Sequence, residues 1–378
     1  MNDNQIQKKA NVPTLRFPEF SGEWERKTLG EDCEINMCKR IFASQTSDTG
    51  DVPFYKIGTI GGKADAFISQ ALFEEYRDRY NFPQKGDVLI SCAGTVGKTV
   101  VYDGQPAYFQ DSNIVWVSNP KQLYINSFLR YILSRVDWRK LNTTTIIRIY
   151  NDNLRELAVN FPSVKEQEKI VGLLSLIDEL IAIQSKIIED LKKLKTAIRD
   201  VIFTAVRNVN DKTEFVSDLL SYEQPTNYIV ESTEYSDNAS LTPVLTANKG
   251  FILGYTPETF GIYIKGECII FDDFTMDSKF VDFPFKVKSS AMKILTVKAG
   301  VDLRFMFEYL QSFDLHSEEH KRHYISEVET MEVSVPEYER QQQIGKILAC
   351  IQGKIDNEIS IKMALLRQKN CLLSTMFI

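Results

Sequence analysis

The segment PSVKEQEKIVGLLSLIDELIAIQSKIIEDLKKLKTAIRDVIF, residues 162–203, has a second copy later in the chain. That copy, PEYERQQQIGKILACIQGKIDNEISIKMALLRQKNCLLSTMF, occupies residues 336–377 and lies 174 positions further on. The two copies align without a gap, and the matching pairs include Pro162 with Pro336, Gln167 with Gln341, Leu174 with Leu348, Lys195 with Lys369 and Phe203 with Phe377. A repeat of this length predicts a duplicated architecture.

Apolar residues recur in each copy at alternating spacings of three and four, which is typical of a coiled-coil seam. The predicted seam comprises Ile170, Leu174, Ile177, Ile181, Ile188 and Leu191 in the first copy, and Ile344, Leu348, Ile351, Ile355 and Leu365 in the second. No proline interrupts residues 164–203, so we expect a helix about 60 Å long. Gln184 and Glu358 share one seam position, where polar side chains can fix the register.

The seam alone also fits two amphipathic helices that bury each other and have no role beyond that packing. A block of comparable size precedes each copy, which favours a larger duplication of globule, helix, globule, helix. Strands are predicted in the first block at residues 52–58, 86–91 and 114–118, with a helix at 124–141. The second block repeats this order with strands at 243–248, 266–271 and 292–297 and a helix at 303–311.

The composition is that of an ordinary globular protein. With 378 residues, 43% hydrophobic and 25% charged, the chain can form two or three domains with cores. No apolar run reaches the roughly 18 residues of a membrane span and residues 1–9 are polar, so we expect a cytoplasmic protein without membrane contact. Six cysteines without a CxxC pair predict reduced thiols and neither a disulfide framework nor a zinc site.

The net charge of −6 is unevenly distributed, because residues 204–335 alone carry −9. Affinity for nucleic acid depends largely on neutralising phosphates. The chain by itself is therefore not expected to hold DNA by bulk charge, and a DNA-binding assembly would need positive surface from a partner.

One motif resembles a phosphate-binding loop. CAGTVGKT, residues 92–99, has Cys92 where the pattern GxxxxGK[ST] requires glycine. A P-loop must also open a helix, whereas VVYDG at residues 100–104 favours a strand and a turn. We therefore expect a glycine-rich loop at a strand end that can bring Lys98 close to DNA.

Two further clusters suggest metal chemistry and are interpreted otherwise. HSEEHKRH, residues 316–323, matches the H-x-x-E-H motif of zinc peptidases. Such an enzyme also needs a further carboxylate ligand and a cleft, and the sequence indicates neither. A solvated or DNA-facing basic helix end is therefore favoured. FDDFTMDSKF, residues 271–280, could hold magnesium in a nuclease, but the usual lysine partner is missing. A surface loop and a base-reading loop both remain open for this segment. We predict no metal site and no catalytic residues.

The chain resembles a specificity subunit of a type I restriction-modification system. The resemblance rests on PTLRFPEFSGEWERKTLG (13–30), on GDVLIS with AGTVG (86–97), and on FPSVKEQEKI and VPEYERQQQI at the starts of the repeated helices. The segments YEQPTNYIV, TPVLTANKGFILGY and IIFDDFT also resemble a recurrent type of target-recognition domain. One departure is ERQQQ in the second helix, where the first copy has a Glu-Gln pair.

The resemblance implies an α+β fold in which two mixed α/β target-recognition domains, 1–161 and 204–335, are separated by antiparallel spacer helices, 162–203 and 336–378, with an internal pseudo-two-fold repeat. It implies that each domain reads one half of a split site in double-stranded DNA, at a gap set by the spacer. The expected partners are two modification subunits, which methylate adenine with S-adenosylmethionine, and two restriction subunits, which use ATP. This chain would be non-catalytic and would hold no cofactor, with S-adenosylmethionine, ATP and magnesium on its partners.

Polar side chains at strand ends can reach the edges of bases in a groove. On that basis the predicted DNA-binding residues are Lys98, Ser112, Asn113, Tyr228, Asn248, Lys249, Asp273, Thr275 and Lys279. Three alternatives stay open: a subunit of a methylation-only system, a coiled-coil scaffold that never touches DNA, and a self-sufficient nuclease or ATPase that turns over with magnesium.

Overall fold

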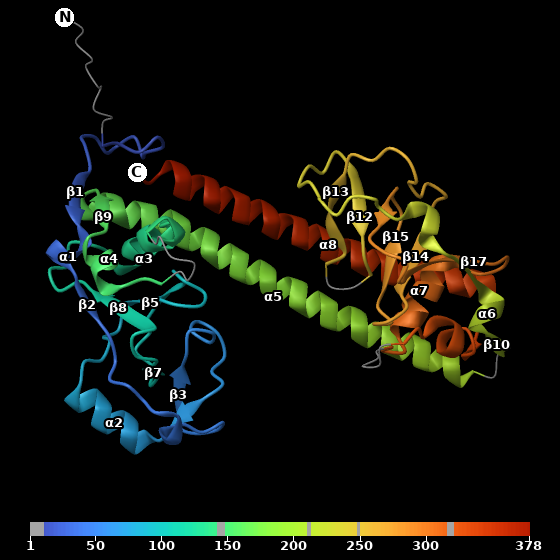
Figure 1. Ribbon diagram of the computed structural model, residues 1–378, viewed down its shortest axis with the longest axis horizontal. Coiled ribbons are helices and arrows are strands. Elements are labelled where there is room, and N and C mark those ends of the chain that lie inside the picture. Colours follow the sequence, from blue (N-terminus) through green and yellow to red (C-terminus); the bar gives the residue numbers. More distant parts are fainter. Residues whose placement is uncertain (1–10, 142–147, 210–212, 248–249, 316–320) are drawn as a thin grey trace, which may run out of the picture. The chain divides into compact units, whose positions relative to one another are not determined.

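Two long helices each take part in two separate units of the chain (Figure 1). The computed structural model describes residues 11–141, 148–209, 213–247, 250–315 and 321–378. The first unit comprises residues 1–183 and 362–378, and the second comprises residues 184–361. Helix α5 (Val164–Asn208) begins in the first unit, whereas α8 (Tyr338–Thr375) begins in the second and ends in the first. Within the described residues, none of the helices is both long and apolar enough to cross a membrane.

The first unit contains three small sheets in the orders β2-β8-β5-β6, β4-β3-β7 and β1-β9. Its elements before α5 are β1 (Glu25–Thr28), α1 (Leu29–Asp32), β2 (Glu34–Asn36), η1 (Ala43–Gln45), β3 (Val52–Tyr55), β4 (Phe67–Ile68), α2 (Gln70–Arg79), β5 (Val88–Ser91), β6 (Thr99–Val101), β7 (Tyr108–Phe109), β8 (Ile114–Ser118), α3 (Asn126–Arg135), η2 (Trp138–Leu141), α4 (Asn151–Arg155) and β9 (Ala158–Phe161). The strand predictions at 52–58, 86–91 and 114–118 fall on β3, β5 and β8.

The second unit repeats this arrangement with sheets in the orders β11-β17-β14-β15, β13-β12-β16 and β10-β18. Its elements between α5 and α8 are β10 (Thr213–Phe215), α6 (Val216–Leu219), β11 (Leu220–Glu223), η3 (Pro225–Tyr228), β12 (Thr242–Leu245), β13 (Ile252–Thr256), β14 (Cys268–Asp272), β15 (Ser278–Val281), β16 (Lys286–Val287), β17 (Met292–Val297), α7 (Leu303–Gln311), η4 (Tyr324–Val328) and β18 (Glu332–Ser334).

Strand direction also repeats between the units. The four-stranded sheets are antiparallel throughout, and each three-stranded sheet has one parallel pair, β3 with β7 and β12 with β16. The duplication predicted from the helices therefore extends to the globular parts. The α+β fold with two β-rich domains and two long helices packed together is confirmed.

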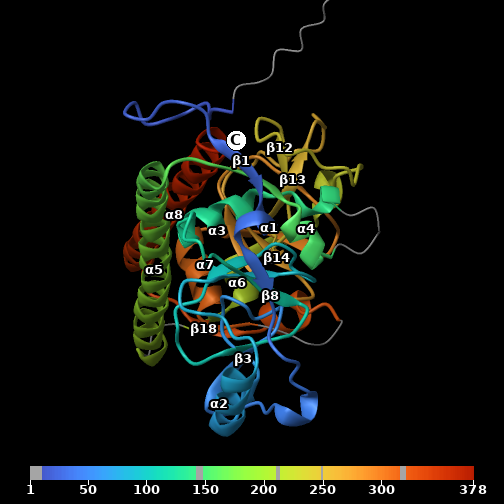
Figure 2. The same cartoon turned by 90° about the vertical axis from the view of Figure 1, so that its left-hand side faces the viewer.

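Each four-stranded sheet is buried on both faces, because an apolar cluster packs against each side. Alternate residues of a strand point to opposite sides and so join different clusters. In β5, Val88 and Ile90 join one apolar cluster with α3, whereas Leu89 joins another with α2 and β3. Figures 1 and 2 both show α2 beside β3, at the end of the first unit away from β1. In β14, Ile269 and Ile270 divide between two clusters in the same way.

Helix boundaries differ from the predictions in two places. The predicted helix at 124–141 breaks after Arg135, because Val136 is extended and the Asp137 carboxylate accepts a hydrogen bond from the Arg139 amide at 3.3 Å to start a separate turn. Helix α5 continues past Phe203 to Asn208, so residues 204–208, which were assigned to the second domain, are helical. The helix predicted at 303–311 coincides with α7.

Candidate nucleic-acid interface

The loop between β5 and β6 reverses the chain at one end of the first unit's main sheet. Gly94 and Gly97 have positive φ angles of 63° and 83°, which favour glycine. A Cβ atom on Gly97 would lie 2.3 Å from Cδ1 of Trp138, so a side chain would collide with the indole. The loop leads into Lys98, which is exposed and whose amide donates to the Ser91 hydroxyl at 3.0 Å. The strand and turn expected in place of a P-loop helix are present.

Two distant segments meet this loop at Cys92. The Cys92 amide donates to the Asn113 carbonyl at 2.7 Å, and the Ile149 amide donates to the Cys92 carbonyl at 2.9 Å. The Arg148 guanidinium then reaches the Ser112 carbonyl, with Nη2 at 3.2 Å. Ser112 has a φ of 52°, which turns the chain sharply before β8. Three predicted residues, Lys98, Ser112 and Asn113, are thus gathered at one strand end together with Arg148.

The second unit builds the same junction at Asp273. The Asp273 amide donates to the Ala291 carbonyl at 2.9 Å, and the His323 amide donates to the Asp273 carbonyl at 3.0 Å. The Asp272 carboxylate accepts from the amides of Phe274 and Thr275 at 2.9 and 3.1 Å, which holds the turn between β14 and β15. Thr275 is exposed at the tip of this turn.

An arginine stands beside each junction. Arg148 immediately precedes Ile149, and Arg322 immediately precedes His323. The 174-residue offset that aligns the two helices also aligns these two arginines. Arg148 is absent from the predicted DNA-binding set, although this offset was the signal that could have identified it. A guanidinium at this place can bind a phosphate or a guanine edge.

Two predicted DNA-binding residues lie inside the second unit and do not reach the surface. Asp273 is 1% exposed, and its carboxylate is occupied by backbone amides and Lys293. Tyr228 is 8% exposed, and its hydroxyl donates to Glu223 at 2.9 Å. Both side chains are internal because each satisfies a buried or half-buried charged partner, which sequence spacing did not indicate.

The remaining predicted residues are dispersed. Lys279 lies on β15, half-buried, and lines a groove of about 690 Å³ with α5, α7 and α8 instead of the loop that carries Thr275. Asn248 and Lys249 lie outside the described residues, as do His316 and His320. His323 is 2% exposed, so the expectation of a solvated helix end is wrong for that residue. In the described parts of the chain, no three histidine, cysteine or acidic side chains gather to form a metal site.

Comparison with known proteins finds a family model that matches part of the chain. The type I restriction modification DNA specificity domain matches residues 21–193. A putative type I restriction enzyme specificity subunit of Haemophilus influenzae is 48% identical over 152 residues, which is 40% of this chain and 40% of that protein. The EcoR124I/EcoR124II specificity subunit of Escherichia coli is 45% identical over 127 residues, 32% of this chain and 31% of that protein. Residues 21–193 of the chain therefore belong to the type I restriction modification DNA specificity domain family.

The alignments with these two curated relatives span less than half of their length. The fold extends further than the sequence identity. The crystal structure of the type I restriction-modification S subunit from M. genitalium matches with a TM-score of 0.64 at 16% identity, over 97% of this chain and 99% of that one. This likeness shows that the specificity-family fold covers both units of the chain.

A buried glutamine attaches the start of each long helix to its unit. Gln167 accepts from the Ile125 amide at 2.8 Å and donates to the carbonyls of Leu123 and Pro162, both at 3.0 Å. Gln341 accepts from the Asp302 amide at 3.0 Å and donates to the Pro336 carbonyl at 2.9 Å. The repeat had paired these glutamines, but their role needed the fold.

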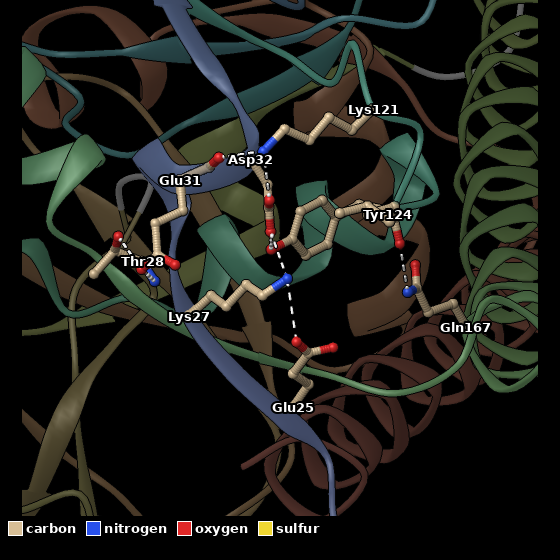
Figure 3. A network of polar contacts seen from close by, with 9 residues as sticks. Glu25, Lys27, Thr28, Glu31, Asp32, Lys121, Tyr124 and Gln167 are labelled. Atoms are coloured by element: carbon tan, nitrogen blue, oxygen red, sulfur yellow. Dashed lines mark hydrogen bonds and ion pairs between the residues drawn. The ribbon is translucent and has the colours of Figure 1, made fainter.

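Figure 3 shows Gln167 beside Tyr124, whose hydroxyl faces the buried Asp32 carboxylate. Lys121 and Lys27 bind the same carboxylate at 3.0 and 3.6 Å. Burial alone would raise the pKa of Asp32, but the hydrogen bond from Lys121 and the two positive charges lower it overall. Asp32 is therefore a charged anchor of the first unit.

The N-terminal arm explains why the two helix starts differ. The Arg16 guanidinium binds the Glu166 carboxylate with two hydrogen bonds of 2.8 and 2.7 Å, and Trp24 donates to it at 3.3 Å. The position equivalent to Glu166 in the second copy is Arg340, which is exposed. Glu166 thus serves an arm that packs on its own unit, and the departure ERQQQ leaves the buried Gln341 in place.

The predicted seam residues are buried or half-buried along α5 and α8. Ile170, Leu174 and Ile177 are at most 5% exposed, and Leu348 and Ile355 at most 2%. The remaining seam residues are buried or half-buried: Ile181, Ile188, Leu191, Ile344, Ile351 and Leu365. The predicted polar position is occupied by a direct contact, in which the Gln184 amide donates to the Glu358 carboxylate. Gln184 and Glu358 are equivalent positions of the repeat, and antiparallel helices bring equivalent positions together only near the middle of the two copies.

Proposed function

We propose that the chain is the non-catalytic DNA-recognition subunit of a type I restriction-modification complex, in which domains 1–161 and 204–335 each read one half of a split site. The proposal rests chiefly on the junction that the two units share, in which a turn at a strand end meets an arginine-bearing segment. Exposed polar and cationic groups at such a junction are suited to phosphate and base contacts. A cytoplasmic location is part of the proposal.

The side chains proposed to face DNA are Lys98, Ser112, Asn113 and Arg148 in the first domain, and Thr275 and Arg322 in the second. Lys279, Asn248 and Lys249 remain secondary proposals. Asp273 and Tyr228 are omitted because they are buried. The acidic second domain is compatible with DNA binding if partner subunits supply phosphate contacts.

The proposed partners are two methyltransferase subunits, which carry S-adenosylmethionine, and two restriction subunits, which use ATP and magnesium. One solved structure supports an assembly of this kind. It concerns complex assembly and conformational transition of the type I R-M system, and its chain matches this one with a TM-score of 0.51 at 12% identity. That likeness concerns the fold, and the assembly is carried over as a proposal. The α5 and α8 pair is proposed to set the gap between half-sites.

A pool of double-stranded DNA with randomised sequence tests the function. The full chain, reconstituted with the methyltransferase subunits of its own system, should select a bipartite sequence. Arg148→Ala should weaken preference at one half and Arg322→Ala at the other, each by about 1–3 kcal/mol if the arginine binds a guanine. Lys193→Ala, on the exposed side of α5, is the control. Selection without any sequence preference would favour a scaffold instead.

A further inference from the structure

Asp273 and Lys293 form an ion pair in the interior of the second unit. Their side chains are each 2% exposed, with Asp273 Oδ2 3.4 Å from Lys293 Nζ. The lysine ammonium lies 4.4 Å from the ring centre of Tyr222 and 5.9 Å from that of Tyr324. Burying two charges costs desolvation energy that their attraction often fails to recover, so such a pair is weak evidence for a stabilising role.

The first unit shows that the fold does not need this pair. Strand register places Cys92 at the position of Asp273, because each follows the last pair between β5 and β8 or between β14 and β17. The same register places Val115 opposite Ile90 and Lys293 opposite Phe271. Cys92 is completely buried and Val115 nearly so. One sheet architecture thus accepts an apolar pair in one unit and a charged pair in the other.

The Asp273 carboxylate does something that Cys92 cannot do. Its Oδ1 accepts hydrogen bonds from the amides of His323 at 3.1 Å and Tyr324 at 2.8 Å. In the first unit, the amide equivalent to Tyr324 belongs to Tyr150 and is capped locally by Asn153 at 2.9 Å. A local cap has therefore been replaced by a bond that reaches across to the β14–β15 turn.

This replacement changes how the arginine segment is held. Both units fasten it through one backbone bond to Cys92 or Asp273. The first unit adds the side chain of Arg148, which is bonded to the Ser112 carbonyl. In the second unit Arg322 is exposed and forms no ion pair with another described residue, so the Asp273 carboxylate supplies the second fastening and leaves the guanidinium available.

We propose that Asp273, neutralised by Lys293, is a positioning residue that fixes Arg322 beside the turn at Phe274–Asp277 for reading the second half-site. This inference rests on the proposed function and assigns the pair to recognition instead of folding. Lys293 acts through Asp273, since an unpaired buried carboxylate would be costly. Neither residue touches DNA.

Two double variants of the full chain separate the amide clamp from the buried charge. Asp273→Asn with Lys293→Met removes both charges and keeps an oxygen acceptor for the two amides. Asp273→Cys with Lys293→Val installs the first unit's pair and removes that acceptor. Each variant, reconstituted with the methyltransferase subunits, is used to select from a double-stranded DNA pool randomised at both half-sites.

We expect the Asn/Met variant to keep the wild-type preference within about twofold. The Cys/Val variant should remain folded, lose about tenfold in preference at the second half-site, as expected for one or two lost hydrogen bonds, and keep the first half-site unchanged. Hydrogen exchange at the Tyr324 amide should accelerate only in the Cys/Val variant.

Retained preference at the second half-site in the Cys/Val variant would overturn the inference, as would failure of that variant to fold, because the pair would then serve stability. Loss of preference in both variants would also overturn it, since the charge and not the clamp would then matter. If the wild-type complex selects no sequence, the proposed function itself fails, which is a distinct result.

Discussion

At the scale of single residues, equivalent positions of the duplicated chain were kept or changed according to their partners. Gln167 and Gln341 both bind backbone groups at a helix start, and both units of the chain present such groups. Glu166 and Arg340 differ because only the first unit has an arm that supplies Arg16. A side chain that binds backbone groups is constrained by the fold, whereas a side chain that binds another side chain can change when its partner changes.

Replacing Gln167 by leucine should destabilise the first unit by about 2–4 kcal/mol, because the Ile125 amide and two carbonyls lose their partner in a buried site. All three tryptophans, Trp24, Trp116 and Trp138, lie in this unit, so urea unfolding followed by tryptophan fluorescence measures the change. Glu168→Ala, on an exposed neighbour, is the control. An equal midpoint for both variants would contradict the role of Gln167.

At the scale of elements, Asp178 connects three helices of the first unit. Its carboxylate accepts from Lys369 of α8 at 2.5 Å and from Arg130 and Tyr131 of α3 at 2.9 and 2.8 Å. Burial alone raises the pKa of Asp178, but these hydrogen bonds outweigh it and lower the pKa below its usual value. The contact depends on a charged carboxylate, so the attachment of α8 to this unit depends on pH.

A group with a lowered pKa in the folded state stabilises that state above its unfolded pKa and loses this contribution as the pH falls through the folded value. Wild type should therefore have a higher thermal midpoint than Asp178→Asn at pH 7. The difference should shrink below about pH 4, the ordinary range of an aspartate. Thermal unfolding followed by tryptophan fluorescence at several pH values provides the measurement. A difference that stays constant down to pH 3 would exclude this role.

The faces of α5 predict unequal effects for two neighbouring leucines. Leu174 is 0% exposed, whereas Leu176 is 61% exposed. Leu174→Ala should cost about 2–5 kcal/mol of stability, because it leaves a cavity in the core of the first unit, and Leu176→Ala should change stability by less than about 0.5 kcal/mol. Urea unfolding of the two variants tests the predicted seam. Similar losses from both would mean that the seam is misplaced.

At the scale of the whole molecule, one chain contains two β-rich units with the same order of strands in their sheets and two helices that each take part in both units. The rise of 1.5 Å per residue makes α5 about 68 Å long, and it is one uninterrupted helix. The C-terminal part of α8 returns to the first unit, where Phe377 stacks on Phe128 with ring centres 5.1 Å apart. Residues from both ends of the sequence therefore complete one core.

Asn210 follows α5 and lies outside the described residues. Insertion of a few residues after it should change the gap between the two half-sites. Both half-sites should stay intact, because none of the residues proposed to face DNA is altered. Methylome sequencing of cells that carry the altered chain and its methyltransferase partner measures both. Changed bases within a half-site, with the gap preserved, would count against a spacing role.

Exchange of residues 214–335 for another recognition domain should change the bases of one half-site only and keep the gap and the other half-site.

The sequence by itself determined the long helices, their register and the duplicated order of strands, because apolar periodicity and a gapless repeat are local properties that can be read along one chain. Only the tertiary structure decided which polar side chains are buried and which partners they bind. Asp273 was expected to read bases and is instead buried against Lys293, and Arg148 was overlooked although it stands at the equivalent junction. Whether a polar side chain faces solvent or a buried partner depends on segments that lie far apart in sequence, and spacing along the chain carries no record of that contact.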